Sequence, residues 1–200
     1  MTEKPVSTIM RIAREKRVIR PRDLAAEGVP RVYLRRLVDK GLLVRTARGI
    51  YTLPDADVTE LHDFAEAARQ VPKGVICLLS ALRFHDLTTQ NPFEVWMAIG
   101  ESQWMPKIEY PAMRFVRFSG PALEYSVERH EIEGVAVQVY SPAKTVADCF
   151  KYRNKIGLDV ALEALRDCWK QRKATMDEIW ASAKVCRVAN IMRPYLESLT

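Results

Sequence analysis

The sequence has few cysteines and histidines, and neither type is spaced as in a metal site. The four cysteines lie far apart among apolar or helical neighbours and form no C-x-x-C pair: Cys77, Cys149, Cys168 and Cys186. The three histidines have no H-x-x-x-H spacing and no cysteine nearby: His62, His85 and His130. We therefore expect buried free thiols and neither a disulfide framework nor a bound metal.

Long hydrophobic runs are also missing. The longest, VICLLSAL at 75–82, is well short of the roughly 20 residues that span a bilayer. The first 17 residues, MTEKPVSTIMRIAREKR, mix charged and apolar positions and lack the uninterrupted apolar core of a secretory signal. We expect no membrane partner and a cytoplasmic protein.

Motifs of catalysis are few. The eight glycines form neither G-x-G-x-x-G nor a Walker A loop, which leaves no signal for a nucleotide cofactor. Ser141 and Lys144 fit S-x-x-K, but no S-D-N or K-T-G follows, and Ser141 precedes Pro142 as a helix N-cap does. The pair His85 and Asp86 reads as a structural contact at the end of an apolar helix. We expect no enzyme, no catalytic residues and no cofactor.

What the chain does have is a strongly uneven charge. Residues 1–58 hold 13 basic and 7 acidic residues, whereas residues 59–200 hold 18 of each, so the net charge of +6 belongs to the first segment. A basic module joined to a neutral body suggests a polyanionic partner for that module. A solvated basic face without a partner is the alternative that charge alone leaves open.

The basic segment has the pattern of a helix-turn-helix. Val6, Ile9, Met10 and Ala13 form the apolar stripe of a first helix that ends near Arg17. A short second helix is predicted over 21–28, from a proline at its first position to a glycine at its end. A third begins at residue 30, also with a proline, and stops at residue 41, again a glycine. Two short helices joined by a glycine turn are typical of this motif.

The third helix has an apolar face and a basic face. Leu34, Leu37 and Val38 share one stripe, which leaves the opposite face for other side chains. In a helix-turn-helix that second face lies in the major groove, where arginine reads guanine and apolar groups contact the thymine methyl. The predicted DNA contacts of this helix are Arg31, Val32, Arg35, Arg36 and Lys40.

A charged hairpin follows the third helix. Strands are predicted over 42–47 and 50–53, with a turn at Arg48 and Gly49 that requires positive φ. This hairpin is interpreted as a wing whose Arg45 and Arg48 contact phosphates or a minor groove. Residues 31–48 hold six basic side chains and one acid, which favours DNA over a winged helix used only for protein contacts.

The stretch PDADVTE at 54–60 predicts a domain boundary, with a winged helix-turn-helix at 1–58 and a second domain at 59–200. In the second domain we expect a helix at 61–70, a buried apolar segment of uncertain type at 75–87, and strands at 93–99 and 113–118. A hairpin about Gly134 and four closing helices follow. The predicted fold class is α+β, with a mixed α/β C-terminal domain that ends in a helical cluster.

Three segments together resemble the AbiEi-type antitoxins of bacterial type IV toxin–antitoxin and abortive-infection (phage-defence) systems. They are GVPRVYLRRLVDKGLLVRTARGIY; VICLLSALRFHDLT with FEVWMAI; and YSPAKTVADCFKYRNKIGLDVALEALR. The resemblance implies an autorepressor that binds double-stranded DNA at inverted repeats in its own promoter. It also implies a C-terminal domain that counters a nucleotidyltransferase-like toxin, without requiring a stable complex with it.

Within that likeness, one polar segment of the C-terminal half is a candidate antitoxicity surface. Its residues are Lys144, Thr145, Asp148, Lys151, Arg153, Asn154 and Lys155, beside Tyr152. The alternative interpretation is an i, i+4 pair of Lys144 and Asp148 on a solvated helix.

Three functions therefore stay open at the level of sequence. The first is a DNA-binding antitoxin and autorepressor. The second is a winged-helix regulator with a ligand-sensing C-terminal domain, and the third is an enzyme fused to a DNA-binding module. No set of mutually supporting catalytic residues favours the third.

Overall fold

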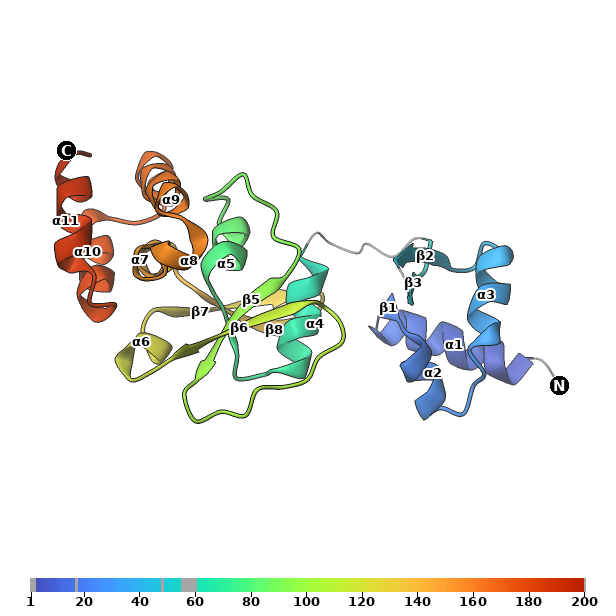
Figure 1. The fold of residues 1–200 in the computed structure, drawn as a ribbon. Coiled ribbons are helices and arrows are strands. Elements are labelled where there is room, and N and C mark those ends of the chain that lie inside the picture. The colour runs from blue at the N-terminus through green and yellow to red at the C-terminus, as the bar shows by residue number, and fades with distance from the viewer. Residues whose placement is uncertain (1–2, 17, 48, 55–60, 200) are drawn as a thin grey trace. The chain divides into compact units, whose positions relative to one another are not determined.

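The computed structural model describes residues 3–16, 18–47, 49–54 and 61–199, and its chain divides into two compact units, Met1–Thr59 and Glu60–Thr200 (Figure 1). The predicted α+β class is confirmed: a winged helix-turn-helix precedes a mixed α/β unit with a helical cluster at its end. Most of the predicted boundary segment, 55–60, lies outside the described residues.

The N-terminal unit consists of three helices and a small sheet. Its elements are α1 (Glu3–Lys16), β1 (Val18–Ile19), α2 (Pro21–Ala26), α3 (Val32–Asp39), β2 (Val44–Ala47) and β3 (Ile50–Thr52). The strands pair antiparallel in the order β1-β3-β2. Ile9, Ile12, Leu24, Leu34 and Leu37 are buried together, so the stripes predicted for α1 and α3 meet in one core.

Two glycines end the helices of this unit, as the sequence predicts. Gly28 and Gly41 have φ of 66° and 68°, the left-handed region that a side chain disfavours. In both turns the glycine and the next residue donate backbone hydrogen bonds to the preceding helix, for example from Leu42 N to Leu37 O at 2.9 Å. This is the Schellman arrangement, which satisfies the last carbonyls of a helix.

The C-terminal unit is built on a mixed five-stranded sheet in the order β6-β5-β4-β8-β7. Its strands are β4 (Val75–Ile76), β5 (Val95–Gly100), β6 (Met113–Phe118), β7 (Val127–Ile132) and β8 (Val135–Tyr140). β5 is parallel to β6 and β4 to β8, whereas β4 with β5 and β7 with β8 are antiparallel. The predicted strands at 93–99 and 113–118 and the hairpin about Gly134 are confirmed.

Both faces of this sheet are covered. Met97 and Ile99 of β5 lie in a core with α4 (His62–Gln70), whereas Trp96 and Ala98 lie in a second core with the C-terminal helices. This explains why β5 is a continuous apolar run, because strands buried on both faces lose the polar alternation. In Figure 1, α4 lies away from the end of the unit where the C-terminal helices gather.

The apolar segment at 75–87, whose type the sequence leaves open, divides into a strand and a helix. After β4 the chain turns at Cys77, and α5 (Leu78–Phe84) begins with Leu78 at φ 47°. Beyond α5, the His85 ring lies 2.7 Å from the carbonyl oxygen of Tyr140, and burial lowers the pKa of this histidine. The histidine thus makes a structural contact with β8, as predicted.

The chain closes with a helical cluster. After α6 (Pro121–Glu124) and the β7–β8 hairpin come α7 (Pro142–Lys151), α8 (Arg153–Ile156), α9 (Leu158–Lys170), α10 (Met176–Val185) and α11 (Ala189–Glu197). The Ser141 hydroxyl accepts from Lys144 N at 3.3 Å, which confirms the predicted N-cap. The first of the four predicted closing helices is divided at Tyr152 into α7 and α8, and the Tyr152 ring stacks on Phe118 with centroids 5.6 Å apart.

All four cysteines are buried and free, as predicted. Burial raises the pKa of Cys168 to about 11 and that of Cys186 to about 12, so both thiols are protonated at neutral pH. Over the described part of the chain, no group of three metal-binding side chains comes together. In that same part, no helix combines the length and the apolar character that crossing a membrane requires.

Candidate nucleic-acid interface and C-terminal surface

The third helix presents the two faces that its sequence predicts. Leu34 and Leu37 are buried in the core of the N-terminal unit. Arg35 and Arg36 are exposed, and the apolar side chain of Val32 is 49% exposed. An exposed valine beside two arginines matches what a recognition helix needs, namely an apolar group for a thymine methyl and forked donors for guanine.

The exposed face extends beyond the helix at both ends. Arg31 precedes α3 and Lys40 follows it, and both are exposed. The guanidinium of Arg36 lies 5.2 Å from the ring centroid of Tyr33, a cation–π contact one turn away. Sequence reasoning missed this contact, although the i, i+3 spacing of the two residues is a visible signal for it.

The hairpin after α3 forms the predicted wing, with shorter strands than expected. Arg45 lies on β2, is exposed and pairs in register with Tyr51 of β3. The ladder shifts between Arg45 and Ala47, and Gly49 has φ of 76°, as a tight hairpin turn requires. Arg48, the other predicted wing contact, lies outside the described residues.

Polar contacts lie at both ends of α2, the helix that precedes α3. The backbone N–H of Arg20 donates to the Asp23 carboxylate at 2.8 Å, which satisfies an otherwise free donor where α2 begins. Arg11 of α1 lies 3.2 Å from Glu27 at the end of α2 and 2.9 Å from Glu15. These two carboxylates raise the pKa of the Arg11 guanidinium.

In the C-terminal unit, the prediction of a surface is wrong for three residues. Lys144, Thr145 and Asp148 are each 0% exposed, because α7 is packed on all sides by the sheet and the neighbouring helices. The alternative of a solvated pair is wrong for the same reason. The i, i+4 pair itself exists, with Lys144 Nζ 2.5 Å from Asp148 Oδ2.

This buried pair joins α7 to its neighbours. Lys144 Nζ lies 4.1 Å from the ring centroid of Tyr140, and the thiol of Cys186 donates to Asp148 at 3.2 Å. Thr145 donates to the carbonyl of Tyr140 at 3.1 Å. Burial raises the pKa of Asp148, and the Lys144 charge opposes that shift. The three side chains therefore belong to the core.

The other four predicted residues do reach the surface. Lys151, Asn154 and Lys155 are exposed, and Arg153 is partly exposed, with its guanidinium donating to the Phe150 carbonyl at 2.9 Å. They lie at the end of α7 and on the short α8. The candidate antitoxicity surface accordingly consists of Lys151, Arg153, Asn154 and Lys155.

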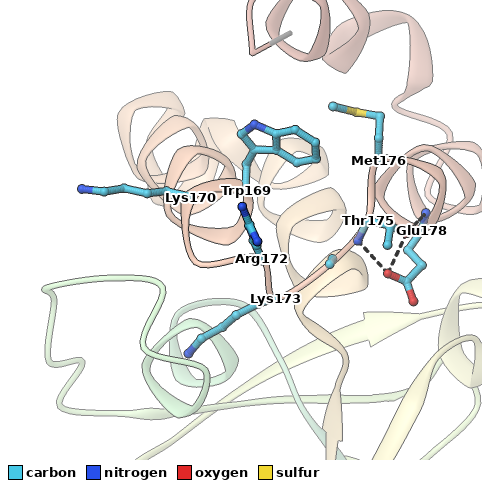
Figure 2. Close-up of a pocket in the computed structure, with 8 residues that line it drawn as sticks. Trp169, Lys170, Arg172, Lys173, Thr175, Met176 and Glu178 are labelled. Carbon is cyan, nitrogen blue, oxygen red and sulfur yellow. Dashed lines mark hydrogen bonds between the residues drawn. The ribbon is translucent and has the colours of Figure 1, made fainter.

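Two hollows flank the helical cluster. The α9–α10 hollow, of about 610 Å³, is lined by Trp169, Lys170, Arg172, Lys173, Ala174, Thr175, Met176 and Glu178. Figure 2 shows Trp169 and Met176 on opposite sides of it, and Lys173 reaching away from the ring. Lys173 donates to the His85 carbonyl, and Glu178 accepts from Thr175 N at 2.7 Å as part of a capping box.

The second hollow, of about 740 Å³, collects residues that are distant in sequence. Lys151 and Arg153 line it together with Lys184 and Arg187, which follow them by more than thirty residues. Sequence reasoning missed Lys184 and Arg187, because nothing local links the end of α10 to the end of α7. We refer to this hollow as the basic cleft.

Part of the chain matches a known protein family. Residues 7–54 match a family described as "Transcriptional regulator, AbiEi antitoxin". The matched segment runs from within α1 to just beyond β3, so it includes α3. None of the curated proteins matches the chain.

Proposed function

We propose that this chain is a DNA-binding antitoxin that represses its own toxin–antitoxin operon, because residues 7–54 match the AbiEi antitoxin family of transcriptional regulators. The N-terminal unit binds inverted repeats in the promoter through α3 and the wing. The C-terminal unit counters a nucleotidyltransferase-like toxin through Lys151, Arg153, Asn154 and Lys155. The observation that supports DNA binding best is the exposed face of α3, with Val32 between Arg31 and the Arg35–Arg36 pair.

The charge of the N-terminal segment supports the same partner. Its net charge of +6 sets it apart from residues 59–200, whose net charge is zero. Neutralising phosphates releases condensed counterions, which drives association of a basic module with DNA regardless of its base sequence. The face of α3 adds the groups that discriminate between bases.

We expect the wing to contribute affinity without discrimination. Arg45→Ala should weaken binding to promoter DNA and to random DNA alike, because a phosphate contact carries no base information. It should also flatten the plot of log K against log salt by about one unit. Titration by fluorescence anisotropy over a range of salt measures both effects. Arg166→Ala, which removes the same charge from the exposed face of α9, is the control, and an unchanged slope for Arg45→Ala rules the contact out.

The two proposed activities should separate in cells. We expect alanine at Arg35 and Arg36 to abolish repression of a promoter reporter while growth in the presence of the toxin is still rescued. Alanine at the four residues of the antitoxicity surface should do the reverse, because these side chains lie in the other unit. The measurements are reporter output and growth during co-expression with the neighbouring toxin frame, transcribed from a separate promoter.

Matched toxin expression makes this experiment decisive. If the Arg35 and Arg36 variant also fails to protect cells, protection works through repression alone. The assignment of a separate antitoxin activity to the C-terminal unit is then wrong. Arg166→Ala should retain both activities. Thermal melts check that the surface variants are folded, since Arg153 bonds to the end of α7.

A further inference from the structure

The basic cleft is bounded by three parts of the C-terminal unit. Ser119 to Ala122 form one side, where β6 ends and α6 begins, and Lys151 and Arg153 form another. The third side is the segment from Lys184 to Ile191, which links α10 to α11. Its volume of about 740 Å³ lies within the range of small-molecule sites, roughly 300 to 1,000 Å³.

The charged side chains that line the cleft are all cationic. Lys151, Arg153, Lys184 and Arg187 contribute four cations, and no carboxylate is among the described residues that line the cleft. This contrasts with the neutral balance of residues 59–200 as a whole. Four cations on one concave surface raise the local positive potential, which favours an anion there. Arginine and lysine side chains both donate to phosphate oxygens.

Apart from Ser119, the other side chains that line the cleft are apolar or a thiol. Pro121 and Ala122 lie on one side, and Val188 and Ile191 on the other. We infer that the cleft binds a phosphorylated small molecule of nucleotide size, with its phosphates against the four cations and its nucleoside against the apolar wall. This inference rests on the cleft alone and not on the proposed antitoxin activity.

The backbone at Arg187 is left-handed, a conformation that glycine adopts more readily than arginine. Arg187 has φ of 60°, and its turn has the Schellman bonds, from Arg187 N to Lys184 O at 3.0 Å and from Val188 N to Ala183 O at 2.8 Å. Gly28 and Gly41 occupy the same position in the N-terminal unit. Glycine therefore fits this backbone position at least as well as arginine does.

The same backbone supplies the variant that tests the proposal. Arg187→Gly removes one cation from the cleft and relieves the left-handed strain, so the variant folds at least as stably as the wild type. In isothermal titration of the full chain with ATP, without divalent cations, we expect Arg187→Gly to raise Kd about tenfold or more, the effect of losing one charge-assisted contact. Lys184→Gln should weaken ATP binding in the same way.

Arg172 provides a matched control. It ends α9 in the same Schellman turn with φ of 55°, but it lines the α9–α10 hollow, where Glu178 contributes a carboxylate. Arg172→Gly therefore makes the same change in backbone and charge outside the cleft, and ATP affinity should be unchanged. Equal weakening by Arg172→Gly, or no binding of ATP to the wild type, overturns the proposal.

Titration with sodium tripolyphosphate distinguishes a nucleotide from an inorganic polyphosphate as the ligand of the cleft. If the apolar wall holds the nucleoside, tripolyphosphate binds more weakly than ATP, and Arg187→Gly weakens both. Equal affinity for the two anions overturns the assignment to a nucleotide and leaves an inorganic polyphosphate site. Because titration measures binding and the reporter and growth assays measure antitoxin activity, failure of this inference is distinguishable from failure of the proposed function.

Discussion

Alanine at Arg35 and Arg36 is expected to remove most of the difference in affinity between promoter DNA and random DNA of the same length. Each arginine that makes a forked contact with a guanine contributes about 1 to 3 kcal/mol of discrimination, which corresponds to roughly 5- to 150-fold in affinity. Both side chains are exposed on α3, opposite the buried Leu34 and Leu37, so the substitutions leave the core intact. Competitive binding assays with both DNAs measure the ratio.

Arg14→Ala is the control for charge in this experiment. Arg14 is exposed on α1 of the same unit, so the variant loses one positive charge, as each single alanine substitution on α3 does, without altering the face of α3. It should leave the ratio of the two affinities unchanged. If the α3 variants lose the same affinity for both DNAs, this helix contacts only phosphates, and the bases are read elsewhere.

The helices and the hairpin of the N-terminal unit were predictable from sequence because their signals are local, whereas β1, which pairs with the distant β3, was missed. The apolar stripe of α3 and the glycines that end α2 and α3 are read within a window of a few residues. Gly49 likewise indicates the hairpin, because it stands at the turn between the two strands and has positive φ. The strand bounds differ by one or two residues, because ladder pairing and not the apolar pattern decides where a strand begins.

The C-terminal sheet depends on contacts that no short window contains. Ile76 of β4 pairs with Val139 of β8, 63 positions later in the chain. β4 itself has two residues, too few for a period of two to be recognised. The type of the apolar segment at 75–87 was therefore undecidable from sequence, whereas the hairpin of β7 and β8 was readable because its partners are adjacent in sequence.

The same limit explains the error at Lys144 and Asp148. An i, i+4 pair of opposite charge has the same spacing on a solvated helix and on a buried one. Nothing local signals burial, because Val146, Cys149 and Phe150 lie opposite the pair, as on an amphipathic helix with one solvated face. The basic cleft had no local signal either, because its cations come from separate helices.

The burial of this pair leads to the largest expected effect on stability. Lys144→Met is expected to lower the free energy of unfolding by about 3 to 5 kcal/mol at neutral pH, because it leaves the Asp148 carboxylate buried without its partner. The loss of the 2.5 Å ion pair is compensated only in part by the Cys186 thiol, a weak donor. Urea denaturation followed by circular dichroism measures the change.

Lys151→Met is the matched control, since it makes the same substitution at an exposed position of the same helix. Its effect should stay within about 0.5 kcal/mol. Replacing both partners, Lys144→Met with Asp148→Leu, should recover much of the loss, because an apolar pair of similar volume needs no counter-charge. These variants also show why growth assays on Lys144 or Asp148 report folding and not an antitoxicity surface.

The loss of stability in Lys144→Met should depend on pH in a defined direction. Burial already raises the pKa of Asp148 in the folded wild type, and removing the opposing lysine raises it further. A carboxyl whose pKa is raised in the folded state binds more protons when the chain is folded. The loss of stability is therefore absent below the pKa of about 3.9 that the carboxyl has in the unfolded chain. It grows as the pH rises through the folded pKa. Relative to wild type, Lys144→Met should therefore regain stability as the pH is lowered from neutral, and a difference that is independent of pH would show that the carboxylate is not the cause.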